Sequence, residues 1–350
     1  MENKPDILNL SLDELIFELD HYAIKPFRAR QIFRWLYTGR ARSFSDMTDI
    51  SKQTRQLLSD RLDIGHIQKM NVEQSEDGTK KYLFRLSDNQ LIETVLIQEE
   101  NHFTLCISSQ VGCAQGCAFC LTAKGGLIRN LTRGEILSQI MEVERDLADP
   151  SELTNIVVMG MGEPLHNYDP MISALKTVMD ADFGLKYSGR RITLSTAGVV
   201  PNMARLGRDI TVNLAVSLNA TDNGTRNRLM PINRKYPMEK LLEACRIFPL
   251  PPRRRITFEY ILMEGINDSP ENAEKLAKLL RPIRAKVNLI PFNEHAQSEF
   301  RRPQEAVISE FQDILIRHHN TVMIRNSKGR DISAACGQLR AKTLEFSCQE

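Results

Sequence analysis

The stretch Gly112-Cys113-Ala114-Gln115-Gly116-Cys117-Ala118-Phe119-Cys120 is the most informative part of the sequence, because its three thiols are spaced four and then three residues apart. Thiolates are the ligands that soft metals and iron–sulfur clusters prefer. The two glycines and Gln115 predict a loop rather than a helix or strand, so the thiols can converge on one centre. Three thiolates bind three corners of a four-iron cluster and leave the fourth iron open to another molecule.

A structural zinc site is the other interpretation of this stretch. Zinc modules usually draw their ligands from two separated pairs of Cys or His. Here the nearest residues for a fourth ligand are Cys106 and His102, in a predicted strand just before the loop. The spacing therefore favours an iron–sulfur cluster. Buried thiols without any ligand are disfavoured, because the glycine-rich stretch does not resemble an apolar element.

Length and composition are those of an ordinary globular protein. The chain has 350 residues, of which 42% are hydrophobic and 26% charged, and its net charge is +2. This length suits one large α/β domain with a small accessory domain. Seven cysteines, with three in one loop, argue against a secreted disulfide framework. No long apolar run and no signal-peptide core are present, so we expect a cytoplasmic protein with no membrane partner.

Short apolar runs alternate with helical segments through most of the chain. This alternation predicts an α/β fold, a partial (β/α)6 barrel whose site lies at the C-terminal ends of its strands. An antiparallel pair of strands is predicted before it, at residues 81–86 and 91–97. The predicted parallel strands, one more than the barrel requires, are residues 103–108, 156–159, 192–195, 212–218, 257–262, 287–290 and 321–324.

The N-terminal part is predicted to be helical, since Ser11 and Glu14 form a capping box before apolar residues at helical spacing. Residues 25–45 contain basic and aromatic residues and no acid. Basic residues can neutralise phosphates and aromatic rings can stack on bases, so this composition suits RNA binding. A helix with a solvated basic face and an aromatic core face explains the same pattern.

Further motifs follow one another in order along the chain. Together they resemble the RlmN/Cfr family of radical S-adenosylmethionine (SAM) RNA methyltransferases, and the resemblance covers essentially the whole chain. The motifs are Cys106-Ile-Ser-Ser-Gln-Val-Gly-Cys113, Arg129-Asn-Leu-Thr132, Met159-Gly-Met-Gly-Glu-Pro-Leu-His-Asn167, Ser195-Thr-Ala-Gly198, Asn213-Leu-Ala-Val-Ser-Leu-Asn-Ala220 and Ala334-Ala-Cys-Gly-Gln-Leu339.

The resemblance implies a [4Fe–4S] cluster on Cys113, Cys117 and Cys120, and two SAM molecules per methylation. It implies methylation of C2 of one adenosine in the peptidyl transferase centre of 23S rRNA, and of the adenosine 3′ of the anticodon in some tRNAs. An electron donor such as flavodoxin or ferredoxin is implied as a partner. The implied segments are a helical RNA-binding accessory domain (1–78), a β-extension (79–104), a radical SAM core barrel (105–325) and a C-terminal segment with a catalytic loop (326–350).

In this family, a cysteine near the C-terminus first accepts a methyl group and then transfers it to adenine. Cys336 matches that cysteine. Cys106 matches a second cysteine, which resolves a covalent protein–RNA intermediate by forming a disulfide. Glu93 matches a proposed proton acceptor, and strand alternation places it on an otherwise apolar face. Either Glu93 or Cys106 then removes the proton from adenine.

For SAM, the resemblance implies that Gly162 and Glu163 bind the methionine ammonium group. A carboxylate at the end of a strand is a suitable partner for a protonated amine. Many relatives carry histidine where this chain has asparagine at position 219. The other implied SAM contacts are Ser195, Ser217, Leu218, Asn219 and Asn293.

Three other functions remain to be weighed. A Cfr-like enzyme would methylate C8 of the same rRNA adenosine, but such enzymes tend to carry a further cysteine where this chain has Val111. A non-catalytic, zinc-stabilised RNA-binding protein would leave Glu163 and Cys336 without a role. A radical SAM enzyme that acts on a protein or a small molecule would not need the basic aromatic stretch at residues 25–42.

Overall fold

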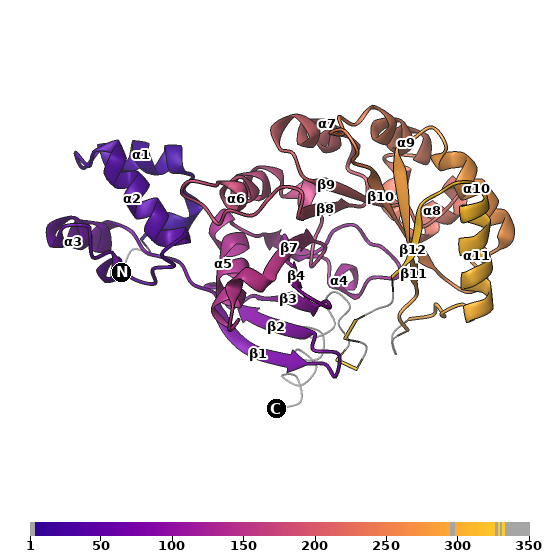
Figure 1. Cartoon of the computed structure of the whole chain (residues 1–350), viewed down its shortest axis with the longest axis horizontal. Coiled ribbons are helices and arrows are strands. Elements are labelled where there is room, and N and C mark those ends of the chain that lie inside the picture. The colour runs from indigo at the N-terminus through magenta and orange to yellow at the C-terminus, as the bar shows by residue number, and fades with distance from the viewer. Residues whose placement is uncertain (1–3, 295–297, 326–327, 330, 333–350) are drawn as a thin grey trace.

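The strands of this protein form a continuous mixed sheet with a curved parallel centre (Figure 1). The computed structural model describes residues 4–294, 298–325, 328–329 and 331–332. Within these residues the main sheet has ten strands in the order β1-β2-β3-β4-β7-β8-β9-β10-β11-β12, and β5 pairs separately with β6. The strands are β1 (Gln68–Gln74), β2 (Lys80–Arg85), β3 (Leu91–Gln98), β4 (Phe103–Cys106), β5 (Gln110–Gly112), β6 (Leu127–Asn130), β7 (Leu153–Val158), β8 (Ile192–Thr196), β9 (Asn213–Ser217), β10 (Ile256–Leu262), β11 (Ala285–Pro291) and β12 (Val322–Ile324).

Strands β4 and β7 to β12 are parallel to one another, which makes seven parallel strands in the described chain. The sheet has β1 and β12 at its two edges, so the barrel is open. The predicted partial (β/α) barrel and its extra strand are therefore confirmed.

No helix in the described ranges is long and apolar enough to cross a membrane. The helices are α1 (Leu12–Asp20), α2 (Pro26–Tyr37), α3 (Lys52–Arg61), α4 (Leu121–Lys124), α5 (Arg133–Arg145), α6 (Tyr168–Met179), α7 (Val200–Asp209), α8 (Asn223–Leu229), α9 (Met238–Ile247), α10 (Pro270–Leu280) and α11 (Glu305–Arg317).

The antiparallel extension of the sheet begins earlier than the sequence pattern indicates. Strands β2 and β3 lie where they were predicted, but β1 adds a strand inside residues 1–78, the segment that was expected to be helical. Almost every residue of β1 is exposed, because it is the edge strand of the sheet. An edge strand with no buried face lacks the alternation of apolar and polar residues by which strands are recognised.

Helices α1 to α3 form the N-terminal unit, which lies at one end of the molecule in Figure 1. The backbone N–H of Ser11 donates to Glu14 Oε2 at 2.7 Å, so the predicted capping box is confirmed. At the junction with the barrel, buried Arg133 of α5 donates to Tyr37 Oη at 2.8 Å and to the carbonyl oxygen of Leu8. A buried cation with several acceptors joins the N-terminal unit to α5 in a defined orientation.

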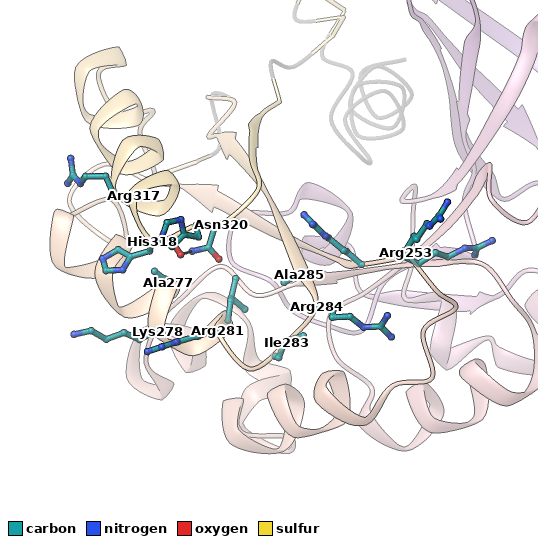
Figure 2. Close-up of a pocket in the computed structure, with 14 residues that line it drawn as sticks. Arg253, Ala277, Lys278, Arg281, Ile283, Arg284, Ala285, Arg317, His318 and Asn320 are labelled. Atoms are coloured by element: carbon teal, nitrogen blue, oxygen red, sulfur yellow. Dashed lines mark hydrogen bonds between the residues drawn. The ribbon is translucent and has the colours of Figure 1, made fainter.

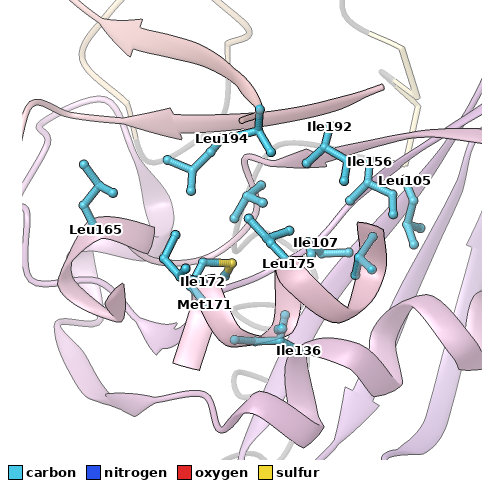
Figure 3. Close-up of a cluster of buried hydrophobic side chains, with 14 of the residues drawn as sticks. Leu105, Ile107, Ile136, Ile156, Leu165, Met171, Ile172, Leu175, Ile192 and Leu194 are labelled. Carbon is cyan, nitrogen blue, oxygen red and sulfur yellow. The ribbon is translucent and has the colours of Figure 1, made fainter. Parts of the chain in front are cut away.

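Aliphatic side chains from the sheet and its outer helices form the core behind the first parallel strands (Figure 3). Leu105, Ile156 and Leu194 come from β4, β7 and β8 and are fully buried, as are Ile136 of α5 and Leu175 of α6. Burial of an aliphatic side chain of this size contributes about 1.5–3 kcal/mol to stability. This packing fixes the strands at whose C-terminal ends the site was predicted.

Candidate active site at the C-terminal ends of the parallel strands

The cysteine loop, residues 113–120, begins directly after β5 and ends where α4 starts. Gly112 has a φ of 78°, and a Cβ atom there would lie only 2.0 Å from the carbonyl oxygen of Gly126. A side chain is therefore excluded at this position. The backbone N–H of Cys113 donates to the same carbonyl at 2.8 Å. The two ends of the segment are thus held together, and the predicted loop is confirmed.

The three thiols of the loop lie close enough to influence one another. Burial raises the pKa of Cys113 to about 11, and the neighbouring Cys120 raises it further. The pKa of Cys117 is also raised, first by burial and then by Cys120 and Cys113. Thiolates that repel one another are stabilised by metal ions, because the ions supply compensating positive charge.

These thiols fit a cluster better than a single ion. Among the described residues, no three His, Cys, Asp or Glu side chains are arranged around one metal ion. A four-iron cluster does not require that arrangement, because each cysteine binds a different iron. The donor set of three thiols on one loop is therefore suited to a [4Fe–4S] cluster.

Gly162 and Glu163 follow β7 and lie beside the cysteine loop. Gly162 has a φ of 101°, and a Cβ atom there would lie 2.5 Å from Gln110 Cβ, so glycine is required. Glu163 is only 3% exposed, and it accepts from the backbone N–H groups of Ala197 at 2.7 Å and Leu165 at 3.1 Å. Burial raises the pKa of this carboxyl to about 7, although these hydrogen bonds favour its charged form. Glu163 is thus a buried carboxylate that a ligand cation would stabilise.

Arg226 connects the ends of β8 and β9, and no sequence pattern indicated it. This side chain is 1% exposed and donates to the carbonyl oxygens of Ala197 at 2.8 Å, Leu218 at 3.1 Å and Ser217 at 3.1 Å. Its charge also lowers the pKa of Cys117. Arg226 lies on the short polar helix α8, whose sequence has no hydrophobic periodicity that would indicate a buried residue. Its position between two strand ends and a cysteine makes it part of the site.

A cavity of about 560 Å³ is lined in part by the end of the cysteine loop. Glu93 from β3, Cys106 from the end of β4 and Cys120 from the loop all line it, together with Asn293. The structure therefore brings together residues that are far apart in the sequence. A volume of this size is typical of sites for small molecules or for a single base.

The remaining predicted SAM contacts lie along the same strand ends. Ser195 and Ser217 belong to β8 and β9, outside the lining of this cavity, and Leu218 is fully buried. Asn219 has a φ of 57°, and its Oδ1 accepts from the backbone N–H of Ile261 at 2.8 Å. Asparagine tolerates this left-handed conformation better than most residues. Its side chain holds the ends of β9 and β10 together.

Residues 331–332 dock on the turn between β1 and β2, a contact that we term the C-terminal anchor. Ser75 Oγ donates to Asp331 Oδ1 at 2.5 Å, and the backbone N–H of Glu76 donates to Asp331 Oδ2 at 3.1 Å. The buried ammonium group of Lys81 donates to the carbonyl oxygen of Ile332 at 2.5 Å. The chain is therefore held against the same extension that carries Glu93.

Cys336 itself lies outside the described residues. The chain before it passes the cavity, since Arg325 and Lys328 both line the cavity wall. The charge of Arg325 also lowers the pKa of Cys106. The described part of the C-terminal segment thus connects the cavity to the C-terminal anchor.

Comparison with known proteins adds an independent line of support. The model of the radical SAM superfamily matches residues 107–280, and that of the ribosomal RNA large subunit methyltransferase N-terminal domain matches residues 5–64. The dual-specificity RNA methyltransferase RlmN of Desulfosudis oleivorans is 59% identical over 97% of this chain and 92% of that protein. The protein of the same name from Geobacter sulfurreducens is 54% identical over 98% of this chain and 94% of its own length.

A solved structure of a similar protein matches the fold over nearly the whole chain. The crystal structure of a radical SAM methyltransferase from Sphaerobacter thermophilus is 43% identical and matches with a TM-score of 0.90. The match covers 95% of this chain and 98% of that one, so it includes both the N-terminal helices and the barrel. Sequence and structure agree over the full described length, and the chain belongs to the RlmN family of the radical SAM superfamily.

Proposed function

We propose that this protein methylates C2 of one adenosine in 23S rRNA and the adenosine 3′ of the anticodon in some tRNAs. The observation that carries the proposal is the cavity at which Glu93 and Cys106 lie beside Cys120. The reaction needs a proton acceptor, a thiol that releases a covalent intermediate and a nearby cluster, and these three residues can supply them. The names of the relatives, dual-specificity RNA methyltransferases, support both classes of RNA.

The cofactors follow from the donor groups at the strand ends. Cys113, Cys117 and Cys120 would hold a [4Fe–4S] cluster, and Glu163 would bind the ammonium group of SAM. When bound, the cluster and SAM would supply the one-electron chemistry that activates the methylated side chain of residue 336. Two SAM molecules are needed, because one supplies the methyl group and the other the radical. Gly162, Ser195, Ser217, Leu218, Asn219 and Asn293 complete the proposed SAM contacts.

The raised pKa of Glu163 predicts a pH dependence of SAM binding. Only the ionised carboxylate pairs with an ammonium group, and in the SAM-free protein this group titrates at about pH 7. As the pH falls below that value, SAM affinity should fall by about tenfold per pH unit, and it should level off above that value. Equilibrium binding between pH 5.5 and 8.5 measures this. A Glu163→Gln enzyme should bind SAM weakly at every pH, whereas a flat profile for the unaltered enzyme would contradict the assignment.

Cys106 and Glu93 have separate roles in the proposed mechanism. Burial raises the pKa of Cys106 to about 11, so this thiol is protonated at neutral pH and is a poor proton acceptor. Glu93 is 4% exposed and faces the same cavity, so we assign proton removal from adenine to its carboxylate. The Cys106 thiolate then attacks the sulfur of residue 336, so that an S–S bond forms and the bond from that sulfur to the RNA-bound methylene carbon breaks. That carbon keeps the electron pair and takes a proton, and the methylated RNA is released. Arg325 favours the thiolate required at that step, because its charge lowers the pKa of Cys106.

A Cys106→Ala enzyme is expected to accumulate a covalent protein–RNA adduct. Without the resolving thiol, the bond between the RNA and residue 336 persists, and the yield of free methylated RNA should fall by at least about a hundredfold. Denaturing gels with end-labelled RNA measure the adduct. A Cys106→Ala/Cys336→Ala double variant is the matched control and should form no adduct. Normal release of methylated RNA by the single variant would exclude the resolving role.

Nucleoside mass spectrometry tests the proposed function as a whole. Reconstituted enzyme, SAM and a reductant react anaerobically with 23S rRNA that lacks the native modification. 2-Methyladenosine is expected, and 8-methyladenosine would assign the protein to the Cfr-like reaction instead. Val111, where Cfr-like enzymes tend to carry cysteine, favours C2. Cleavage of SAM without any methylated adenosine would mean that the RNA substrate is wrong. Flavodoxin or ferredoxin would supply electrons in the cell.

The basic surface of the N-terminal unit supports RNA binding. Its aromatic residues support RNA binding less than the composition suggested, because most of them are buried. Phe33 and Tyr37 of α2 are core residues, Trp35 is partly buried and donates its Nε1–H to Asp49, and Phe27 is 50% exposed. The basic residues at positions 40 and 42 form ion pairs with α5. The exposed cations that remain on α2 and its N-cap are Lys25, Arg30 and Arg34.

A further inference from the structure

A second cavity lies at the opposite ends of the parallel strands from the candidate active site. Its volume is about 950 Å³, and it lies among the connections that lead into β10, β11 and β12 (Figure 2). In the part of the chain that the structure describes, seven lining residues are Arg or Lys: Arg253, Arg254, Arg255, Lys278, Arg281, Arg284 and Arg317.

The excess positive charge of the protein is concentrated at this cavity. Of the 46 basic residues in the sequence, seven line it, and the other 39 are outnumbered by the 44 acidic residues. The three connections, residues 248–255, 281–284 and 318–321, contain no acid. Among the ion pairs of the described residues, the one at the cavity joins His318 to Glu274 at 2.5 Å and involves none of the seven cations. The protein is therefore close to neutral overall but strongly positive here.

Most of these cations make no side-chain hydrogen bond or ion pair with the residues that the structure describes. Arg255 donates to Thr321 Oγ1, and Arg284 donates to the carbonyl oxygen of Leu250 at 3.1 Å. Nη1 of Arg254 is buried and has no acceptor. Like charges that share one concavity repel one another, so their proximity costs free energy unless an anion is bound. Cavity-lining side chains without a hydrogen bond or ion pair in the described residues are Arg253, Arg254, Lys278, Arg281 and Arg317.

The position of the cavity limits the choice of partner. Strand β10 has seven residues, so about 20 Å separates its two ends. A redox protein docked at this cavity would stand a full strand length away from the cysteine loop. RNA has no such restriction, because a folded RNA that presents one base to the active site can extend tens of ångströms beyond it. Guanidinium groups also match phosphate geometry, since each can donate two parallel hydrogen bonds.

We propose that this basic cavity binds the sugar–phosphate backbone of the RNA substrate at a point remote from the modified adenosine. The inference rests on the proposed function, because it takes RNA to be the substrate. Contacts of this kind carry no sequence information and set the position of the RNA on the enzyme. The cavity thus helps to orient an RNA whose target base lies at the other end of the barrel.

A triple variant, Arg253→Gln/Arg281→Gln/Arg317→Gln, tests this assignment with one substitution in each of the first two connections and one at Arg317, the last residue of α11 before the third. All three side chains are exposed and make no hydrogen bond within the described residues, so the fold should not change. The matched control is Arg190→Gln/Arg191→Gln/Arg208→Gln, which removes the same charge from exposed sites outside the cavity. Reconstituted enzymes are titrated with the 23S rRNA fragment between 50 and 300 mM salt, and SAM cleavage is measured in parallel.

The cavity variant should bind RNA at least about tenfold more weakly at low salt, and its slope of log affinity against log salt should fall by about two to three. SAM cleavage and the control variant should be unaffected. If the cavity variant and the control bind RNA equally well, the inference is wrong while the proposed function stands. If instead RNA affinity is unchanged and reduction by flavodoxin slows, the cavity binds the electron donor. If the unaltered enzyme binds no RNA, both the proposed function and this inference fail.

Discussion

A Cys117→Ala enzyme is expected to contain almost no iron and to have no measurable methylation activity. Cys117 is electrostatically coupled to the rest of the site, since Cys120, Cys113 and Glu163 raise its pKa and Arg226 lowers it. Two thiolates cannot hold the cluster with one open iron, and residues that act as a unit lose activity together. Methylation should fall by at least about a thousandfold. Iron and sulfide analysis, with the absorbance of the cluster, measures the loss directly.

Cys245→Ala is the matched control for this substitution. Cys245 is also buried, but it belongs to the hydrophobic core beneath α9. The control should bind a full cluster and lose at most some stability from the small cavity it creates. Methylation by the iron-free Cys117→Ala protein would exclude the radical mechanism altogether. A zinc-bound protein with intact RNA binding and no iron would support the structural zinc interpretation.

A Cys336→Ala enzyme is expected to cleave SAM but to methylate nothing. The cluster loop and the proposed SAM contacts do not include residue 336, so formation of 5′-deoxyadenosine should remain within a fewfold of normal. Transfer to RNA should be undetectable, because no methyl group is held on the protein. The last described residue before it in the chain, Ile332, is held by Lys81 of β2, four positions before Cys336 in the sequence.

The ratio of 5′-deoxyadenosine to methyladenosine is the measurement that separates these two variants. Cys336→Ala should yield the first product without the second, whereas Cys117→Ala should yield neither. Cys348→Ala, in the same C-terminal segment, is the matched control and should yield both. Methyladenosine from the Cys336→Ala enzyme would show that another group carries the methyl group.

The parallel strands and the cysteine loop were predictable because each is a local pattern. A strand buried on both faces is a short apolar run, and the loop is marked by its glycines and thiol spacing. The approach of Glu93 to Cys106 was partly predictable, since one lies on a predicted hairpin and the other at the end of the next strand. The structure adds the pairing of β3 with β4, which brings both to one cavity.

Other features depend on tertiary contacts that no local sequence pattern indicates. Strand β1 is exposed along its length, so its sequence has no strand period. Arg226 is recognised only from the three carbonyl oxygens around it. The amide of Asn219 links two strand ends, a role that the residue type alone does not reveal. The three consecutive arginines at 253–255 are visible in the sequence, but their meeting with the other two connections in one basic cavity is not.

The C-terminal anchor also has a consequence for how the protein is made. The hydrogen bond between Ser75 and Asp331 joins residues separated by 256 positions. Contacts of such long sequence separation form late, because a large loop must close before they are gained. A ribosome must therefore translate nearly the whole message before the β1–β2 turn can meet its partner. The enzyme therefore lacks this contact until its synthesis is almost finished.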